Sequence, residues 1–223
     1  MCGRYVQFSL FPLLKQEFYL RGPGIDLSPS WNIAPTKDVP VVVNEDGNRL
    51  FLCRWGLIPP WSKDPSIGNR MINARSETLT LKPSFKGPFR KSRCLIPADG
   101  FFEWKKEGKG KTPQYITMKD GRPFGFAGLF TDWTAPGGKT VRTCVIVTTP
   151  ANSLITPIHE RMPAIIPPGE RDLWLNPKIQ DPGTLTHLLI PYPSDEMEAW
   201  EASRKVNRPE NDSPENIRKT SGV

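Results

Sequence analysis

The second residue of the chain is a cysteine, Cys2, and Gly3 follows it. Initiator methionine is commonly removed before a small residue, and loss of Met1 would leave Cys2 with a free α-amine beside its thiol. The reference pKa of an α-amine is about 7.7–8.0, so part of it is neutral near pH 7 and able to attack an aldehyde. The thiol can then close a thiazolidine ring, an intramolecular step with a high effective molarity. Position alone leaves open that Cys2 is an ordinary residue near the chain end.

Two polar residues in apolar surroundings could move protons. Glu103 lies in Phe101-Phe102-Glu103-Trp104, and a carboxylate desolvated by aromatic neighbours is suited to act as a general acid. A surface-facing position on an alternating strand is the other interpretation. His159 is one of two histidines and lies between prolines in an expected loop, where its imidazole could shuttle protons. It could equally be a buried, hydrogen-bonded histidine.

Two further segments have side chains suited to a nucleotide. Asn73, Arg75 and Ser76 lie within four residues of one another and could bind a phosphate or a sugar, or begin a helix with Asn73 or Ser76 as its cap. The segment from Trp55 to Trp61 is rich in tryptophan and proline. It could stack on bases or form a packed corner.

The charge is uneven along the chain. The formal net charge is +7. Residues 82–111 hold nine Lys and Arg against three acidic residues, whereas residues 194–217 hold seven acidic residues against three basic ones. The basic stretch also contains phenylalanines and Trp104, so it suits nucleic acid, with cations for phosphates and rings for unstacked bases. A solvated, lysine-rich loop and hairpin is the alternative.

The composition favours one globular unit. The 223 residues include 25 prolines, about twice the usual share, which predicts many turns and few long helices. The four cysteines lie far apart and only two histidines are present, so we expect no zinc site and no disulfides. No apolar run is long enough to span a membrane and no signal peptide is evident, so we expect an intracellular protein.

Local patterns predict a mixed fold of short strands. Apolar runs flank residues 44–48 as a hairpin, and Asp120-Gly121 predicts a second hairpin joining residues 114–118 to 123–130. A buried strand is expected over residues 143–149. Helices are expected over residues 9–20 with Ser9 as cap, 152–158, 168–175 and 196–205. The polar segment after Asn207 is expected to be loose.

Eight short segments extend from residue 1 to about residue 207. They are Met1-Cys2-Gly3-Arg4, Trp31-Asn32-Ile33-Ala34-Pro35-Thr36, Arg54-Trp55-Gly56-Leu57-Ile58-Pro59-Pro60-Trp61, Ile72-Asn73-Ala74-Arg75-Ser76-Glu77-Thr78, Arg93-Cys94-Leu95-Ile96-Pro97-Ala98-Asp99-Gly100-Phe101-Phe102-Glu103-Trp104, Phe126-Ala127-Gly128-Leu129, Ile158-His159-Glu160-Arg161-Met162-Pro163 and Val206-Asn207. In this order, the eight segments resemble the SRAP (SOS response-associated peptidase) family of abasic-site shielding proteins.

The resemblance implies an α+β single domain, residues 1–207, with a strand-rich barrel-like core, short peripheral helices and a basic DNA channel; residues 208–223 would be a polar C-terminal tail. It also implies binding to single-stranded DNA that carries an abasic site, with a covalent thiazolidine crosslink between Cys2 and the ring-opened sugar aldehyde. Lyase-type activity on the abasic site and autoproteolytic removal of Met1 are further expectations from the family.

The same resemblance implies a role for each matching residue. Cys2 would be the nucleophile through both amine and thiol, Glu103 an acid/base in ring opening and in reversal, and His159 an aid to Schiff-base formation. Asn73 would orient Cys2 or the sugar. The remaining residues would contact DNA, the arginines at phosphates and the tryptophans at its border: Arg4, Trp61, Arg75, Ser76, Trp104 and Arg161.

Two other functions remain open at this point. One is an N-terminal-nucleophile amidohydrolase or peptidase, which would also expose a Cys-Gly terminus. The other is a non-covalent reader of single-stranded or modified DNA. For the crosslinking function we expect no cofactor and no metal, a monomer that binds single-stranded DNA and no membrane, and a cytoplasmic, nucleoid-associated location in a bacterium or a nuclear one in a eukaryote.

Overall fold

In the computed structural model, which describes residues 2–108 and 110–219, the apolar runs around residues 44–48 form the predicted hairpin. Its strands are β3 (Asp38–Asn44) and β4 (Asn48–Trp55), paired in antiparallel register along their length. At the turn, Asp46 and Gly47 have φ values of 55° and 99°. Glycine adopts this left-handed conformation freely and aspartate tolerates it, so the turn residues fit the turn.

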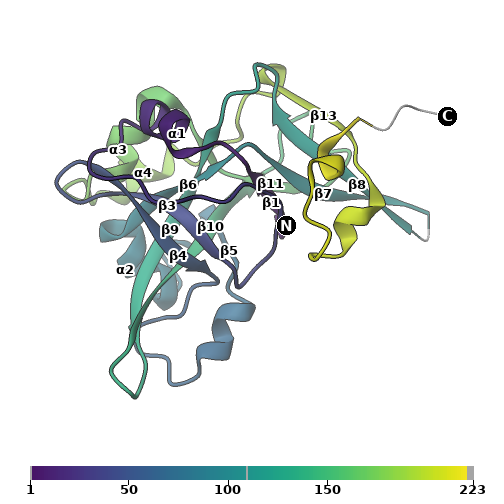
Figure 1. The fold of residues 1–223 in the computed structure, drawn as a ribbon. Helices are drawn as coiled ribbons and strands as arrows, with labels where there is room; N and C mark the ends of the chain where they lie inside the picture. Colours follow the sequence, from purple (N-terminus) through teal and green to yellow (C-terminus); the bar gives the residue numbers. More distant parts are fainter. Residues whose placement is uncertain (1, 109, 220–223) are drawn as a thin grey trace.

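Three more strands join this hairpin: β6 (Arg93–Ala98), β9 (Phe124–Thr134) and β10 (Thr140–Pro150). β3 pairs with β6, β6 with β9, and β9 with β10, all in antiparallel orientation. β10 then pairs with β4 in parallel and closes the ring (Figure 1). Each of the five strands thus has a partner on both sides, which removes the exposed edges of an open sheet. The predicted α+β fold with a barrel-like core is confirmed.

A second sheet lies beside the barrel and contains, in spatial order, β13 (Met197–Glu201), β8 (Gly110–Met118), β7 (Gly100–Glu107), β1 (Tyr5–Gln7) and β2 (Ser30–Ile33). All of its pairings are antiparallel. Three short strands extend the barrel sheet: β5 (Asn73–Arg75), β11 (Arg161–Pro163) and β12 (Ile165–Ile166). β5 and β11 both pair with β10, and they lie close to β1 of the second sheet (Figure 1).

The helices are short, as the proline content predicts. Three of the four α-helices carry proline in the first turn, where its missing N–H costs no hydrogen bond. The α-helices are α1 (Phe11–Glu17), α2 (Pro83–Lys91), α3 (Arg171–Leu175) and α4 (Pro182–Thr186). The 3₁₀ helices are η1 (Pro65–Asn69), η2 (Ser76–Thr78), η3 (Pro168–Glu170), η4 (Ser194–Glu196), η5 (Arg204–Asn207) and η6 (Pro214–Ile217). No described helix has the length and apolar character that crossing a bilayer requires.

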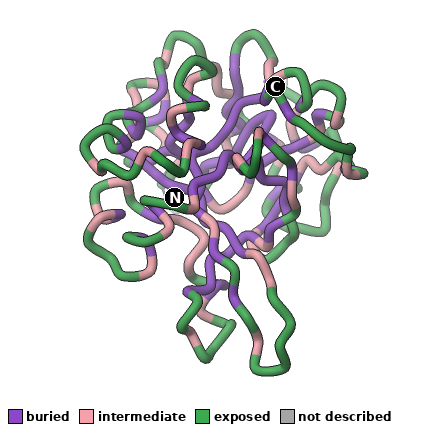
Figure 2. The backbone as a smooth tube through the Cα atoms, turned by 90° about the vertical axis from the view of Figure 1, so that its left-hand side faces the viewer, coloured by how far each residue is buried: buried purple, intermediate pink, exposed green. Residues whose placement is uncertain are grey.

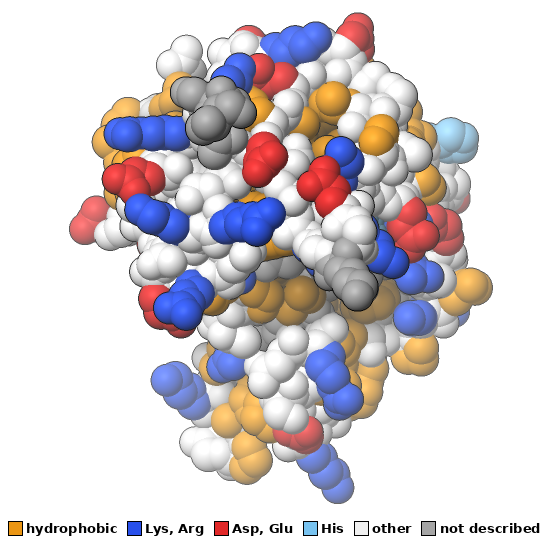
Figure 3. Space-filling model, turned by 90° about the vertical axis from the view of Figure 1, so that its right-hand side faces the viewer, with side chains coloured by type: hydrophobic (Ala, Val, Ile, Leu, Met, Phe, Trp, Pro, Cys, Tyr) orange, Lys and Arg blue, Asp and Glu red, His pale blue; other side chains and the backbone are white. Residues whose placement is uncertain are grey.

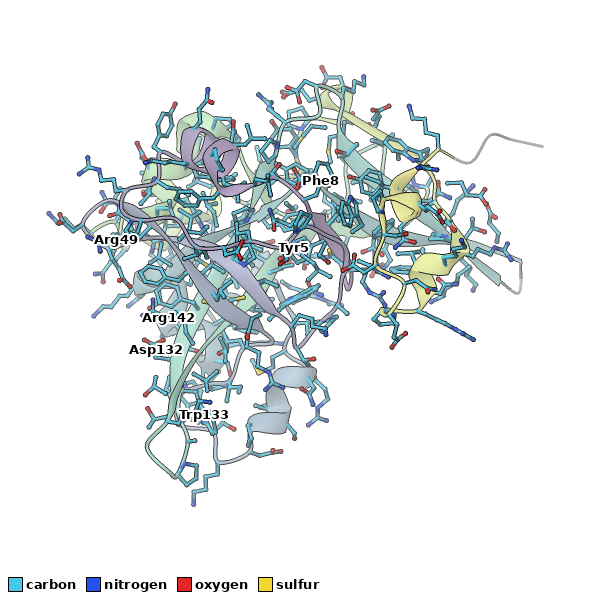
Figure 4. All side chains as sticks on the ribbon, viewed as in Figure 1. Tyr5, Phe8, Arg49, Asp132, Trp133 and Arg142 are labelled. Atoms are coloured by element: carbon cyan, nitrogen blue, oxygen red, sulfur yellow. The ribbon has the colours of Figure 1, made fainter. Side chains whose placement is uncertain are left out.

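Buried residues concentrate along the strands, and exposed residues occupy the outer loops (Figure 2). Phe126 of β9 is fully buried in the core. Its ring packs edge-on against the rings of Tyr5 and Phe101, at centroid distances of 5.8 Å and 5.9 Å. Because Tyr5 and Phe101 belong to the second sheet, this aromatic cluster ties the barrel to that sheet; Tyr5 is labelled in the interior in Figure 4.

Truncating this ring should lower stability strongly. We expect Phe126→Ala to reduce the free energy of unfolding by about 3–5 kcal/mol, since the change removes apolar contacts and leaves a cavity between the sheets. Urea unfolding followed by tryptophan fluorescence measures the change. Leu52→Ala is the control: Leu52 is 52% exposed, and we expect a change within about 0.5 kcal/mol. Equal losses for the two variants would contradict a core role for Phe126.

The chain between β8 and β9 does not form the predicted hairpin. β8 pairs with β7 and β13, whereas β9 belongs to the barrel. The turn at Asp120-Gly121 is present, with Gly121 at a φ of 70°, but it connects the two sheets. The local turn signal is therefore real, and the inference that its flanking strands pair is wrong.

The helix predicted over residues 196–205 is also wrong. Met197–Glu201 form β13, which pairs with β8 over its whole length, and a helical turn begins only at Arg204. Partnership with a sheet edge overrides the helical composition. The predicted helix over residues 152–158 forms turns only, and α1 is shorter than predicted. Ser9 does not cap α1, because its hydroxyl donates to the carboxylate of Asp99.

The polar segment after Asn207 was expected to be loose, but residues 208–219 are held in place. The carboxylate of Asp212 accepts hydrogen bonds from the Ser30 hydroxyl at 2.7 Å and from the Trp31 N–H at 2.5 Å. Asn216 is fully buried. These contacts hold the segment against the second sheet, and residues 220–223 lie outside the described part.

The basic stretch over residues 82–111 is more than the solvated loop and hairpin that was the alternative to a nucleic-acid surface. It contains α2 and β6 before the β7–β8 hairpin. Its four phenylalanines are buried in the core, so these rings are unavailable for stacking on bases. Only the half-buried Trp104 remains near the surface among the aromatic residues of that stretch. The cations of the stretch, not its phenylalanines, are therefore the feature suited to DNA.

Candidate functional site

Cys2 lies three residues before β1 of the second sheet, and Asn73 of the barrel strand β5 binds its backbone carbonyl, so Cys2 lies at the junction of the barrel and the second sheet. It is fully buried within the main core cluster. Its thiol donates to the backbone carbonyl of Arg4 at a Sγ–O distance of 3.8 Å. Burial, and then the nearby negative charge of Glu103, raise the pKa of this thiol far above its ordinary value. The thiol is therefore protonated near neutral pH.

Asn73 binds Cys2 directly. Its side-chain Nδ2 donates to the backbone carbonyl oxygen of Cys2 at 2.8 Å. Asn73 begins the strand β5, which runs parallel to β10, so the alternative of Asn73 as a helix cap is excluded. The side-chain Oδ1 of Asn73 is buried without a hydrogen-bond partner. One side of this amide thus fixes the position of Cys2, and an acceptor atom stays available beside it.

Glu103 lies on β7, opposite Gln114 of β8, and is only 3% exposed. The surface-facing alternative is therefore excluded. Its carboxylate is close enough to Cys2 to raise the pKa of the thiol. Glu103 and His159 line the same open pocket of about 390 Å³, although they are 56 positions apart in the sequence. The two residues singled out for proton transfer thus converge on one space.

His159 lies two residues before β11 and is half-buried. Its Nδ1 accepts a hydrogen bond from the backbone N–H of Arg161 at 3.0 Å. An accepting Nδ1 carries no proton, so this bond selects the neutral tautomer with its proton on Nε2. His159 also lines the pocket that it shares with Glu103.

The three predicted phosphate-binding arginines differ in their availability. Arg75 is exposed. Arg4 is half-buried, donates to Asn32 Oδ1 and to the carbonyl of Val206, and lies 6.0 Å from the ring of Trp104.

The guanidinium of Arg161 is almost enclosed. It donates to both carboxylate oxygens of Glu77, at 2.6 Å and 3.0 Å, and to the carbonyl of Thr148 at 2.6 Å. The pairing with Arg161 lowers the pKa of Glu77. Arg75 is therefore the arginine of the three that is most open to an incoming phosphate.

The tryptophans also differ in how far they are exposed. Trp61 is 61% exposed, whereas Trp55 is fully buried and packs edge-on against Tyr5 at 5.4 Å. The Trp55–Trp61 segment is thus a packed corner at one end and an exposed ring at the other. Trp104 lines the pocket of Glu103, and its Nε1 donates to Asn207 Oδ1 at 2.7 Å. Ser76 is half-buried and begins η2.

Sequence reasoning missed four residues at this junction. Lys111 and Asn207 line the pocket of Glu103, and Glu77 holds Arg161. The Tyr5 hydroxyl is buried without a hydrogen-bond partner, and its proximity to Cys2 contributes to its raised pKa, of which burial is the main cause. Lys111 lay in the basic stretch, and Asn207 and Glu77 lay in family segments, but no local signal pointed to Tyr5.

Charged side chains of both signs lie around the junction. Seen from the side of the second sheet, Lys and Arg side chains are spread over the surface among acidic ones, and a hollow crosses its middle (Figure 3). On the barrel surface, Arg142 pairs with Asp132 at 2.8 Å (Figure 4). Within residues 2–108 and 110–219, no group of His, Cys, Asp and Glu side chains has the arrangement of a metal site.

Comparison with known proteins supports one family. The family model described as SOS response associated peptidase (SRAP) matches residues 1–209. The Bacillus subtilis (strain 168) protein named abasic site processing protein YoqW is 47% identical over 221 residues, which cover 97% of this chain and 99% of that protein. The Gallus gallus protein named abasic site processing protein HMCES is 32% identical over 84% of this chain and 65% of that protein.

Solved structures share the fold. A crystal structure of a protein from Bacteroides thetaiotaomicron matches with a TM-score of 0.87 and 29% identity, over 98% of this chain and 100% of that one. A protein from Bordetella bronchiseptica matches with a TM-score of 0.78 at 24% identity, over 91% of this chain. Together with the eight sequence segments and the junction that they form, these matches show that the chain belongs to the SRAP family.

Proposed function

We propose that this protein captures abasic sites in single-stranded DNA by forming a thiazolidine between Cys2 and the ring-opened sugar. The observation that carries the proposal is the hydrogen bond from Asn73 to the Cys2 carbonyl, which holds the start of the chain beside Glu103. The names of the relatives, abasic site processing proteins, support the same substrate. Removal of Met1 is a requirement, since the reaction uses the α-amine of Cys2.

The reaction proceeds in two bond-forming stages. The α-amine attacks the aldehyde carbon, and the resulting carbinolamine loses water to give an imine. The thiol then adds to the imine carbon: the sulfur–carbon bond forms, and the thiol proton passes to the nitrogen. One water is released overall, and no oxidant, reductant or cofactor is needed. The raised pKa of the thiol supports this order, with the amine acting first.

Glu103 and His159 supply and accept the protons. Loss of water from the carbinolamine requires a proton donor at the departing hydroxyl, and sulfur addition requires an acceptor for the thiol proton. The charge of Glu103 raises the pKa of the thiol, and His159, whose Nδ1 accepts a hydrogen bond from the Arg161 N–H, carries its proton on Nε2. We assign the role of general acid and base to Glu103. We assign to His159 the donation of a hydrogen bond to the carbinolamine oxygen.

The DNA contacts extend outward from this centre. We assign phosphate contacts to Arg4, Arg75 and Arg161, with the exposed Arg75 as the strongest of them, and a polar contact to Ser76. We assign Trp61 and Trp104 to the border of the bound DNA strand, where an aromatic ring can stack on an unpaired base. The direct test is a heat-stable adduct between the mature protein and an oligonucleotide with one abasic site, which an oligonucleotide without the site must not form.

Binding before the covalent step should weaken with salt. Each phosphate contact releases counterions, with a slope of roughly −0.7 per contact for single strands. Three contacts predict a slope of about −2 for the logarithm of the binding constant against that of salt concentration. Fluorescence anisotropy with a tetrahydrofuran abasic analogue, which has no aldehyde, measures this step alone. A slope near zero would contradict the assigned phosphate contacts.

A further inference from the structure

A second pocket, of about 480 Å³, opens on the Asn73 side of Cys2. We call it the basic pocket; three cations line it, Arg70, Arg75 and Lys82, together with the polar side chains of Asn73 and Ser84. No carboxylate lines it, in contrast to the pocket that contains Glu103. Its volume falls in the range of about 300–1,000 Å³ that is typical of ligand sites.

Local structure explains why these side chains converge. Asn73 and Arg75 are two residues apart on the strand β5, so they face the same side, and Ala74 between them is buried on the other. Lys82 is the N-cap residue of the nine-residue helix α2, and Ser84 lies in its first turn. That turn contains no acidic residue, and the helix dipole adds positive potential there.

The three cations are available to an incoming anion. Arg70, Arg75 and Lys82 are all exposed. Across the described ranges, none of them forms a salt bridge with a carboxylate, whereas Arg161 and Arg142 do. Three like charges around one pocket repel one another unless an anion lies between them. The pocket is therefore suited to a phosphate.

The position of the pocket indicates which phosphate of the DNA it would bind. Asn73 lines it and also donates to the Cys2 carbonyl at 2.8 Å, so a phosphate bound there would lie next to the nucleophile. On the proposed function, the abasic sugar must reach both Cys2 and the pocket of Glu103 and His159. The backbone on one side of that sugar then leads toward the basic pocket.

We propose that the basic pocket binds the phosphate directly flanking the abasic sugar on one side, with Arg70 and Lys82 as contacts in addition to Arg75. This inference rests on the proposed function. It makes the site bipartite, with anion binding on one side of Cys2 and proton transfer on the other. The sugar is thereby anchored through its phosphate before any bond to Cys2 forms.

Neutral phosphates test this assignment. Single-stranded oligonucleotides would carry a tetrahydrofuran abasic analogue and one methylphosphonate, at the 5′-flanking phosphate, the 3′-flanking phosphate or a distant one. Dissociation constants come from fluorescence anisotropy. For the wild-type protein we expect one flanking substitution to weaken binding roughly tenfold, the size of a lost charge-assisted hydrogen bond. The distant substitution should have a smaller effect.

The decisive comparison uses two double variants of equal charge. In Arg70→Gln/Lys82→Gln, the effect of neutralising the sensitive flanking phosphate should fall well below tenfold, because two of the three cations that contact it are gone and only Arg75 remains. Lys86→Gln/Arg90→Gln removes two exposed cations of α2 that do not line the pocket, and it should keep the full tenfold sensitivity. Full sensitivity in the first variant, an equal loss in the second, or insensitivity of the wild type at both flanking positions would each overturn the proposal.

This experiment is independent of the covalent chemistry. The analogue cannot form an imine, so the pocket can fail while an aldehyde-bearing oligonucleotide still crosslinks to Cys2. Conversely, absence of a crosslink with the aldehyde would reject the proposed function whatever the methylphosphonate series gives.

Discussion

Cys2→Ala is expected to abolish the heat-stable adduct with abasic single-stranded DNA. The variant keeps an α-amine after Met1 removal and can still form an imine, but it has no thiol to close the ring. An imine hydrolyses on heating, whereas the thiazolidine persists. A denaturing gel after heating, with intact mass as a second readout, should show an adduct for the wild-type protein and none for the variant.

Two controls separate lost chemistry from lost structure. Cys2 is fully buried in the core, so thermal unfolding of the variant must be measured alongside. Binding to the tetrahydrofuran analogue should stay within about twofold of wild type, since Cys2 makes none of the assigned phosphate contacts. A variant that folds, binds and still crosslinks at the wild-type level after heating would refute the ring-closure mechanism.

Glu103→Gln should slow crosslink formation by about 10² to 10⁴-fold, the usual contribution of a positioned acid or base. The substitution keeps the shape of the side chain in its buried position on β7 and removes its charge. Single-turnover kinetics with excess protein over aldehyde-bearing DNA measure the rate. Glu107→Gln, on the same strand but exposed, is the matched control and should leave the rate unchanged.

The direction of this effect also separates two roles for Glu103. Its negative charge helps to raise the pKa of the Cys2 thiol, so Glu103→Gln lowers that pKa and increases the thiolate fraction at a given pH. If thiolate attack limited the rate, the variant would react faster than wild type. A slower reaction, as we expect, identifies proton transfer by Glu103 as the larger contribution, and a faster one would contradict its acid/base assignment.

The residues with intrinsic chemistry could be predicted from the sequence, but their convergence could not. The two nucleophiles of a mature Cys2 follow from its position alone, and the aromatic neighbours of Glu103 indicated desolvation, which the structure confirms. That Glu103 and His159 share one pocket depends on how the second sheet, which contains β7, lies against the barrel sheet, which β11 extends. Such long-range proximity leaves no periodic or spacing signal in the chain.

The failures of local prediction have a common physical cause. At Asp120-Gly121 the turn residues were identified correctly, yet the strands that they join pair with other partners. Met197–Glu201 have a helical composition, but they form a strand because they pair with β8. The polar segment after Asn207 is held by Asp212 and the buried Asn216, and neither contact has a local signature. In each case tertiary partners override the local preference.

The basic stretch illustrates the same limit for function. Interleaved lysines and phenylalanines indicated a nucleic-acid surface, but the phenylalanines proved to be core residues. Lys82 of that stretch lines the basic pocket together with Arg70, which lies outside it. Composition therefore predicted a nucleic-acid partner, while the pocket that we propose for its phosphate could be recognised only from the fold.

Peptide mapping of the purified adduct by mass spectrometry tests the central claim most directly. After digestion of protein and DNA, we expect the sugar remnant on the N-terminal peptide, with Met1 absent, Cys2 modified, and a mass equal to the two reactants less one water. A remnant on an internal lysine, or crosslinked molecules that retain Met1, would contradict the account.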